Sequence, residues 1–150
     1  MSERPAPDFT LSATGNQSIT LSALRGRKVV IYFYPKASTP GCTTQACGLR
    51  DIRSELEARN TLVFGISPDP VSRLKKFEEK QQLNFTLLSD EDHAVADAFG
   101  VWGPKKFMGK EFDGIHRISF LVDEQGVIAK VFDDFKTSNH HQVVLDYLDQ

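Results

Sequence analysis

The sequence has few cysteines and no cluster of basic residues, and each shortage excludes a class of protein. Only two of the 150 residues are cysteine, which excludes a disulfide-rich secreted scaffold. The 18 basic and 20 acidic residues give a net charge of −2, so neither nucleic acid nor an acidic membrane surface is an expected partner. The isolated lysine pairs at residues 75–76 and 105–106 are predicted to be solvated.

Targeting and membrane-spanning segments are also lacking. Residues 1–5 have no apolar core of a signal peptide, and no apolar run approaches the roughly 20 residues of a membrane span. We therefore expect a cytoplasmic protein with no membrane partner. In a reducing compartment, two cysteines are more often catalytic or redox-active than structural. The length and the 40% hydrophobic content predict a single domain over residues 1–150.

The sequence also lacks the motifs of common cofactor sites. It has no G-x-G-x-x-G or Walker motif, which disfavours nucleotide cofactors. Its histidines do not fall at metal-ligand spacing with the cysteines, so no metal site is expected. These histidines are His93, His116, His140 and His141.

Hydrophobic periodicity predicts an ordered series of strands and helices. We expect a hairpin over residues 9–21, strands at 28–34, 62–67 and 84–88, helices at 42–59, 70–81 and 92–99, a loop at 105–114, a hairpin of strands 115–122 and 127–132, and a helix at 139–148. A βαβ unit followed by ββα is typical of the thioredoxin-like fold. The predicted fold class is therefore α/β: a central mixed β-sheet flanked by helices, with an N-terminal β-hairpin.

Cys42 lies where a predicted strand gives way to a predicted helix. Thr39 suits the N-cap, Pro40 suits the first helical position, and Cys42 then falls at the third. The helix dipole and the unpaired N–H groups of the first turn favour a thiolate there. Cys42 is therefore a candidate nucleophile.

Cys47 follows Cys42 by five residues. In an ideal α-helix this spacing separates the Cα atoms by roughly 8.7 Å, whereas a disulfide needs less than about 7 Å. The two thiols can bond only if the first turns of the helix unwind, which suits a redox cycle better than a permanent crosslink. The alternative is that Cys47 is a buried core cysteine.

The residues around Cys42 resemble the active-site signature of the peroxiredoxins, Pro35-x-x-x-Thr39-x-x-Cys42. Further segments resemble the peroxiredoxin Q subfamily, also called bacterioferritin comigratory proteins, in order and over nearly the whole chain. These segments are residues 33–36, 39–43, 50–51, 65–67, 87–90, 100–102 and 117–123. Gln45 is a departure, because glutamate is usual there, but no departure removes a catalytic group.

The resemblance implies a fold of the peroxiredoxin type and a role for each residue of the signature. Cys42 would be the peroxidatic cysteine and Cys47 the resolving cysteine, while Thr39, Pro35 and Arg117 would complete the catalytic site. The implied reaction reduces hydrogen peroxide and organic hydroperoxides through a sulfenic acid and then an intramolecular disulfide. Thioredoxin, or glutaredoxin, would restore the thiols, and a monomer is expected.

The chemistry of displacement at oxygen explains why these residue types are suitable. Arg117 can contact both the sulfur and the peroxide, and the hydroxyl of Thr39 can donate or accept a hydrogen bond. The N–H group of Gly41 at the helix start can hold a peroxide oxygen, and Pro35 can shield the pocket from water. Each residue also has a simpler interpretation. Arg117 could be an exposed strand residue, Thr39 could serve only as an N-cap, and Pro35 could only end a strand.

Two other functions use the same residues. A thioredoxin-like disulfide oxidoreductase is disfavoured because it needs Cys-x-x-Cys, whereas four residues separate Cys42 from Cys47. A non-enzymatic redox sensor, whose helix unwinds to expose a partner surface, remains open. A sensor stops after one equivalent of peroxide, whereas an enzyme with a reductant consumes many.

Overall fold

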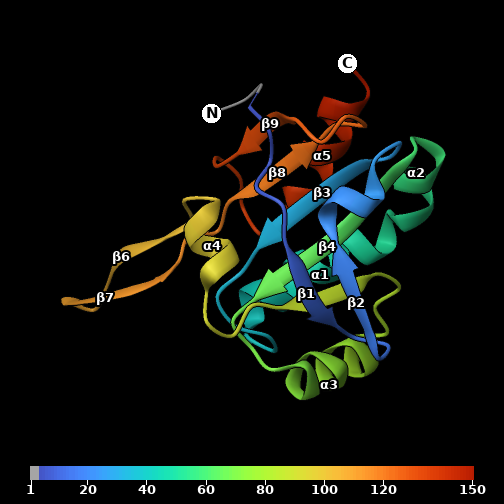
Figure 1. The fold of residues 1–150 in the computed structure, drawn as a ribbon. Coiled ribbons are helices and arrows are strands. Elements are labelled where there is room, and N and C mark those ends of the chain that lie inside the picture. The colour runs from blue at the N-terminus through green and yellow to red at the C-terminus, as the bar shows by residue number, and fades with distance from the viewer. Residues whose placement is uncertain (1–3) are drawn as a thin grey trace.

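The computed structural model describes residues 4–150, apart from the side chain of Phe107, and shows a seven-stranded sheet with helices on both faces (Figure 1). The strands are β1 (Thr10–Ala13), β2 (Gln17–Thr20), β3 (Lys28–Phe33), β4 (Thr61–Ser67), β5 (Thr86–Ser89), β6 (Trp102–Phe107), β7 (Lys110–Ile115), β8 (Ser119–Val122) and β9 (Ile128–Phe132). The helices are η1 (Leu21–Leu24, a 3-10 helix), α1 (Pro40–Asp51), α2 (Arg53–Ala58), α3 (Val71–Gln81), α4 (Ala94–Ala98) and α5 (His140–Leu148). Among the described residues, no helix is long and apolar enough to cross a membrane.

The sheet has the strand order β2-β1-β5-β4-β3-β8-β9 and mixed strand directions. Strands β3, β4 and β5 are parallel, while β8 and β9 add an antiparallel pair beside β3. The predicted hairpin of β1 and β2 joins the other edge through β5. This arrangement confirms the predicted thioredoxin-like fold.

Strand β3 is buried on both faces, which explains its unbroken apolar sequence. Val30 and Tyr32 belong to a core cluster shared with helices α1, α2, α3 and α5. Ile31 and Phe33 belong to a second cluster, which includes Phe9 and residues of α4. The loop that follows β3 therefore starts from a fixed point in the middle of the molecule.

The prediction of a loop at residues 105–114 is wrong, because this segment lies in the hairpin of β6 and β7. Met108 and Gly109 form its two-residue turn, and both have positive φ, at 53° and 79°. Figure 1 shows this hairpin extending away from the rest of the molecule. Most of its side chains are exposed, so no buried face imposes the alternation of apolar residues that predicts a strand.

Two other predicted boundaries are also wrong. The helix expected over residues 42–59 is interrupted at Ile52, whose φ of −108° and ψ of 15° end α1 before α2 begins. The apolar spacing of Leu49, Ile52 and Leu56 continues through the break, so periodicity gives no sign of it. The strand expected over residues 115–122 begins only at Ser119, because Ile115 belongs to β7.

Candidate active site

The loop between β3 and α1 presents Cys42 at the start of the helix. Pro40 is the first helical residue, and Cys42 is therefore the third, as predicted. The buried carboxylate of Asp69, beyond the end of β4, holds this loop by accepting hydrogen bonds from the Ala37 N–H at 2.8 Å and the Ser67 hydroxyl at 2.9 Å. Two neighbouring parallel strands thus fix the position of the cysteine.

Cys42 and Arg117 form the centre of the site. The Cys42 side chain is buried, with only 1% of its surface exposed, and both terminal nitrogens of Arg117 lie 3.4 Å from its sulfur. Arg117 lies between β7 and β8, outside any strand, and the Phe33 N–H anchors this segment by donating to the Ile118 carbonyl at 3.1 Å. The guanidinium therefore meets the sulfur at the carboxyl end of β3.

Gln45 is a site residue for which sequence reasoning assigned no contact. It lies one turn after Cys42 on α1 and is fully buried. Its Oε1 accepts a hydrogen bond from Nη1 of Arg117 at 2.7 Å. Its Nε2 has no hydrogen-bond partner among the residues that the structure describes. The sequence offered two signals for it: its place three residues after a candidate nucleophile, and its departure from the glutamate that is usual there.

The remaining residues of the signature lie in the loop that leads from β3 to Cys42. Thr39 occupies the N-cap position, but its side chain makes no capping hydrogen bond, and instead its hydroxyl donates to the Lys36 carbonyl at 2.9 Å. The predicted N-cap position of Thr39 is confirmed, although no side-chain cap forms, and in this geometry the hydroxyl oxygen is free to accept a hydrogen bond from a ligand. Gly41 is half-buried beside Arg117, and Pro35 is half-buried in the same loop.

Cys47 lies on the same unbroken helix as Cys42, but its thiol contacts the end of α3. Both cysteines are unpaired, and the Cys47 thiol donates to Oε1 of Gln81, at the end of α3, across 3.7 Å. Arg50 Nη1 donates to the carbonyl oxygen of the same Gln81 at 2.7 Å. Since α1 is continuous from Pro40 to Asp51, the two thiols stay apart until the helix opens.

Two further ionisable groups lie near Arg117. Burial, and then the charge of Arg117, lower the pKa of Lys105, whose Nζ donates to the Ile115 carbonyl at 2.7 Å. Lys105 is half-buried, whereas the sequence predicted a solvated lysine. Burial, followed by the charges of His141 and Arg117, lowers the pKa of His140 to about 3, and His140 Nε2 lies 2.8 Å from the Ser119 hydroxyl. His140 is therefore neutral near pH 7.

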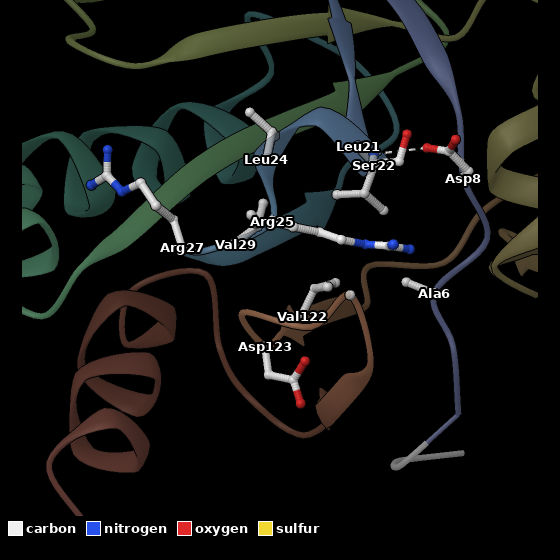
Figure 2. Close-up of a pocket in the computed structure, with 11 residues that line it drawn as sticks. Ala6, Asp8, Leu21, Ser22, Leu24, Arg25, Arg27, Val29, Val122 and Asp123 are labelled. Carbon is white, nitrogen blue, oxygen red and sulfur yellow. Dashed lines mark hydrogen bonds between the residues drawn. The ribbon is translucent and has the colours of Figure 1, made fainter.

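A separate cavity lies at the opposite end of the sheet (Figure 2). It is lined by Val29 at the start of β3 and Val122 at the end of β8, whereas Cys42 follows the end of β3. Its volume of about 20 Å³ leaves room for little more than a water molecule. Figure 2 shows Asp8 beside Ser22, whose N–H donates to its carboxylate at 2.9 Å. The position and size of this cavity make it unsuitable for chemistry at Cys42.

No group of three or more His, Cys, Asp or Glu side chains in residues 4–150 is arranged to hold a metal ion. The chemistry available here is that of a buried sulfur at a helix N-terminus, facing a guanidinium that can donate several hydrogen bonds.

Comparison with known proteins identifies the family. Residues 3–131 match the model of the AhpC/TSA family. The chain belongs to the AhpC/TSA family, in its peroxiredoxin Q subfamily. A putative peroxiredoxin bcp of Haemophilus influenzae is 62% identical over 95% of this chain and 92% of its own length. Peroxiredoxin Bcp of Escherichia coli K12 is 59% identical over the same shares of the two chains.

Solved structures of peroxiredoxin Q proteins have the same fold. A bacterioferritin comigratory protein of Xanthomonas campestris, studied for its alkyl peroxide reduction activity, matches with a TM-score of 0.89 and 36% identity over 94% of this chain and 90% of its own. A mutant PrxQ of Xylella fastidiosa matches with a TM-score of 0.93 and 29% identity over 99% of this chain and 95% of its own. The peroxiredoxin resemblance of the sequence is thereby confirmed.

Proposed function

We propose that this peroxiredoxin is a thiol-dependent peroxidase that reduces hydrogen peroxide and organic hydroperoxides, with Cys42 as the peroxidatic nucleophile. The observation that carries the proposal is the pair of 3.4 Å contacts from Arg117 to the Cys42 sulfur. A guanidinium beside a buried sulfur stabilises the thiolate, which is the reactive form. The alkyl peroxide reduction activity of the related X. campestris protein supports organic hydroperoxides as substrates.

In the first step the Cys42 thiolate attacks one oxygen of the peroxide. The S–O bond forms as the O–O bond breaks, and the second oxygen leaves with the bonding electron pair and takes up a proton, giving water or an alcohol. Arg117 and the N–H groups of Gly41 and Cys42 can stabilise the charge that builds on the leaving oxygen. Thr39 can accept a hydrogen bond from the hydroperoxide, and Pro35 shields the site from water.

In the second step Cys47 resolves the sulfenic acid on Cys42. The Cys47 sulfur attacks the Cys42 sulfur, an S–S bond forms, and the oxygen leaves as water. This step requires α1 to open, and the thiol of Cys47 must leave Gln81. The Cys47 side chain is half-buried on α1, which supports a resolving role within one chain.

Reduction of the disulfide completes the cycle. A dithiol protein supplies two electrons, and we propose thioredoxin, with glutaredoxin as the other candidate. We also propose a monomer, because a disulfide within one helix needs no second subunit. We propose a cytoplasmic location, because the disulfide must be reduced again after each turnover.

The alternative is a redox sensor without turnover. The opening of α1 that the disulfide requires would also change the surface of the protein, which is the observation that favours this second function. It predicts that peroxide is consumed once per chain and no more.

Peroxide consumption with thioredoxin, thioredoxin reductase and NADPH tests the proposal in the wild type, Cys42→Ser and Cys47→Ser. We expect multiple turnovers in the wild type, none in Cys42→Ser and impaired recycling in Cys47→Ser. A single equivalent consumed by the wild type, with thioredoxin or glutaredoxin present, would favour the sensor. No fast reaction at Cys42 would contradict both functions.

A further inference from the structure

We propose that Thr137 is a specificity-determining residue, which limits the size of the hydroperoxide that reaches Cys42. The inference rests on the proposed function and concerns the substrate of the same site. Thr137 lies in the loop between β9 and α5, about 95 residues after Cys42 in the chain, and sequence reasoning gave it no role.

The atoms that a side chain on Gly41 would meet show where Thr137 lies. A Cβ atom built on Gly41 would lie 3.6 Å from Nη2 of Arg117 and 3.6 Å from Cγ2 of Thr137, with the Thr137 hydroxyl at 4.0 Å. Arg117 Nη2 is itself 3.4 Å from the Cys42 sulfur. The space next to Gly41 is therefore bordered by the guanidinium on one side and by the Thr137 side chain on another.

The loop holds Thr137 in a defined place. The Lys136 N–H donates to Oδ1 of Asn139 at 2.8 Å, and the Asn139 N–H donates to the Lys136 carbonyl at 3.0 Å. The ring of Phe135 lies with its centroid 4.5 Å from that of the buried His140. A turn closed by two hydrogen bonds and anchored by an aromatic contact cannot easily move its side chain aside.

The geometry of the reaction directs the substrate toward this residue. Displacement at oxygen aligns the sulfur with the O–O bond, so the second oxygen and its substituent point away from Cys42. Cys42 is only 1% exposed, and the substituent must occupy the space outside it, next to Gly41 and Arg117. Thr137 is half-buried there, so its methyl group and hydroxyl border the path of an alkyl substituent but leave hydrogen peroxide unhindered.

The test compares the kcat/KM of hydrogen peroxide with that of cumene hydroperoxide, a bulky substrate, in variants at position 137. For Thr137→Leu we expect about a 10-fold loss with cumene hydroperoxide and less than about a 2-fold change with hydrogen peroxide. For Thr137→Ala we expect about a 2- to 3-fold gain with cumene hydroperoxide. Thr137→Val keeps the size of the side chain without its hydroxyl and should keep the wild-type ratio.

Ser138→Leu is the matched control, because it introduces the same side chain at an exposed position of the same turn and should leave the ratio unchanged. The inference is overturned if neither Thr137→Leu nor Thr137→Ala changes the ratio, or if Thr137→Leu lowers both values equally. In either case the Cys42-dependent activity of the wild type would still stand. A wild type without such activity would instead contradict the proposed function itself.

Discussion

Gln45 holds Arg117 through a 2.7 Å hydrogen bond to Nη1, and Arg117 in turn lies 3.4 Å from the sulfur of Cys42. The acceptor is a neutral amide, and it is fully buried one helical turn from the sulfur. A neutral acceptor orients the guanidinium without opposing its charge, so the positive charge acts on the thiolate. Lys105, the neutral His140 and Tyr32 also interact with this guanidinium, and Tyr32 and Tyr34 lie near the sulfur.

Gln45→Glu should shift the pH dependence of peroxide reduction to higher pH. The carboxylate keeps the acceptor but adds a charge that competes with the thiolate for Arg117. We expect the pH at half-maximal rate to rise. Stopped-flow mixing of the reduced protein with hydrogen peroxide from pH 5 to 9 measures this shift.

Gln45→Leu provides the control for this experiment, because it removes the acceptor without adding charge. It should lower the rate at every pH through loss of the orientation of Arg117. If Gln45→Glu and Gln45→Leu had the same pH profile, the charge argument would be contradicted.

Arg117→Lys should keep a positive charge near Cys42 and lose most of the catalysis. Lysine offers a single ammonium on a flexible stem in place of a planar fork that contacts the sulfur with two nitrogens. We expect the second-order rate constant with hydrogen peroxide to fall by about 10²-fold. Arg53→Lys, in the ion pair with Glu57 on α2, is a control that should leave this constant unchanged. A loss below about threefold for Arg117→Lys would show that charge alone is sufficient.

Cys47→Ser should be inactivated by excess peroxide faster than the wild type. Without the resolving thiol, the sulfenic acid on Cys42 persists and a second peroxide can oxidise it to the sulfinic acid. The fraction of sulfinic Cys42, measured by mass spectrometry against peroxide dose, should rise at lower doses in the variant. If the sulfinic fraction rose at the same peroxide dose in both proteins, a resolving role for Cys47 would be contradicted.

The stability of the protein should fall as the pH drops below about 6.5, because burial keeps His140 unprotonated in the folded protein whereas the unfolded chain binds a proton there. Its pKa is about 3 in the folded protein, against an ordinary value of about 6.5 for a histidine in the unfolded chain, so only the unfolded chain binds the proton between these values. The contribution of His140 is complete above pH 6.5 and decreases toward pH 3, by about 2 kcal/mol at pH 5.

Urea unfolding of the wild type and His140→Gln at pH 7.5 and pH 5 measures this contribution. The difference in unfolding free energy between the two pH values should be about 2 kcal/mol smaller in His140→Gln. An unchanged difference in His140→Gln would contradict the buried, neutral state of His140.

The central part of the fold was predictable because its sequence carries two strong signals. The apolar run of β3 and the helical spacing after Cys42 reflect burial, which constrains many residues at once. The hairpin of β6 and β7 was missed because most of its side chains are exposed, and only the Met108-Gly109 turn indicates it. The break at Ile52 was missed because the apolar spacing continues across it.

The candidate site was predictable only where a motif specified it. Cys42 and its helix position follow from local sequence, whereas the contact of Arg117 with Cys42 joins residues 75 apart. The contacts of Gln45 and Thr137 depend on where Arg117 and the β9–α5 loop lie in space. Local patterns carry no information on such distances, so these residues required the structure.

The most direct test of this account is peptide mapping by mass spectrometry after one equivalent of hydrogen peroxide is added to the reduced protein. We predict a Cys42–Cys47 disulfide in the wild type, and in Cys47→Ser a sulfenic acid on Cys42 that a dimedone label traps. Cys42→Ser should show neither product. Recovery of the first oxidation on Cys47, with the Cys42 thiol intact, would contradict the assignment of Cys42 as the nucleophile.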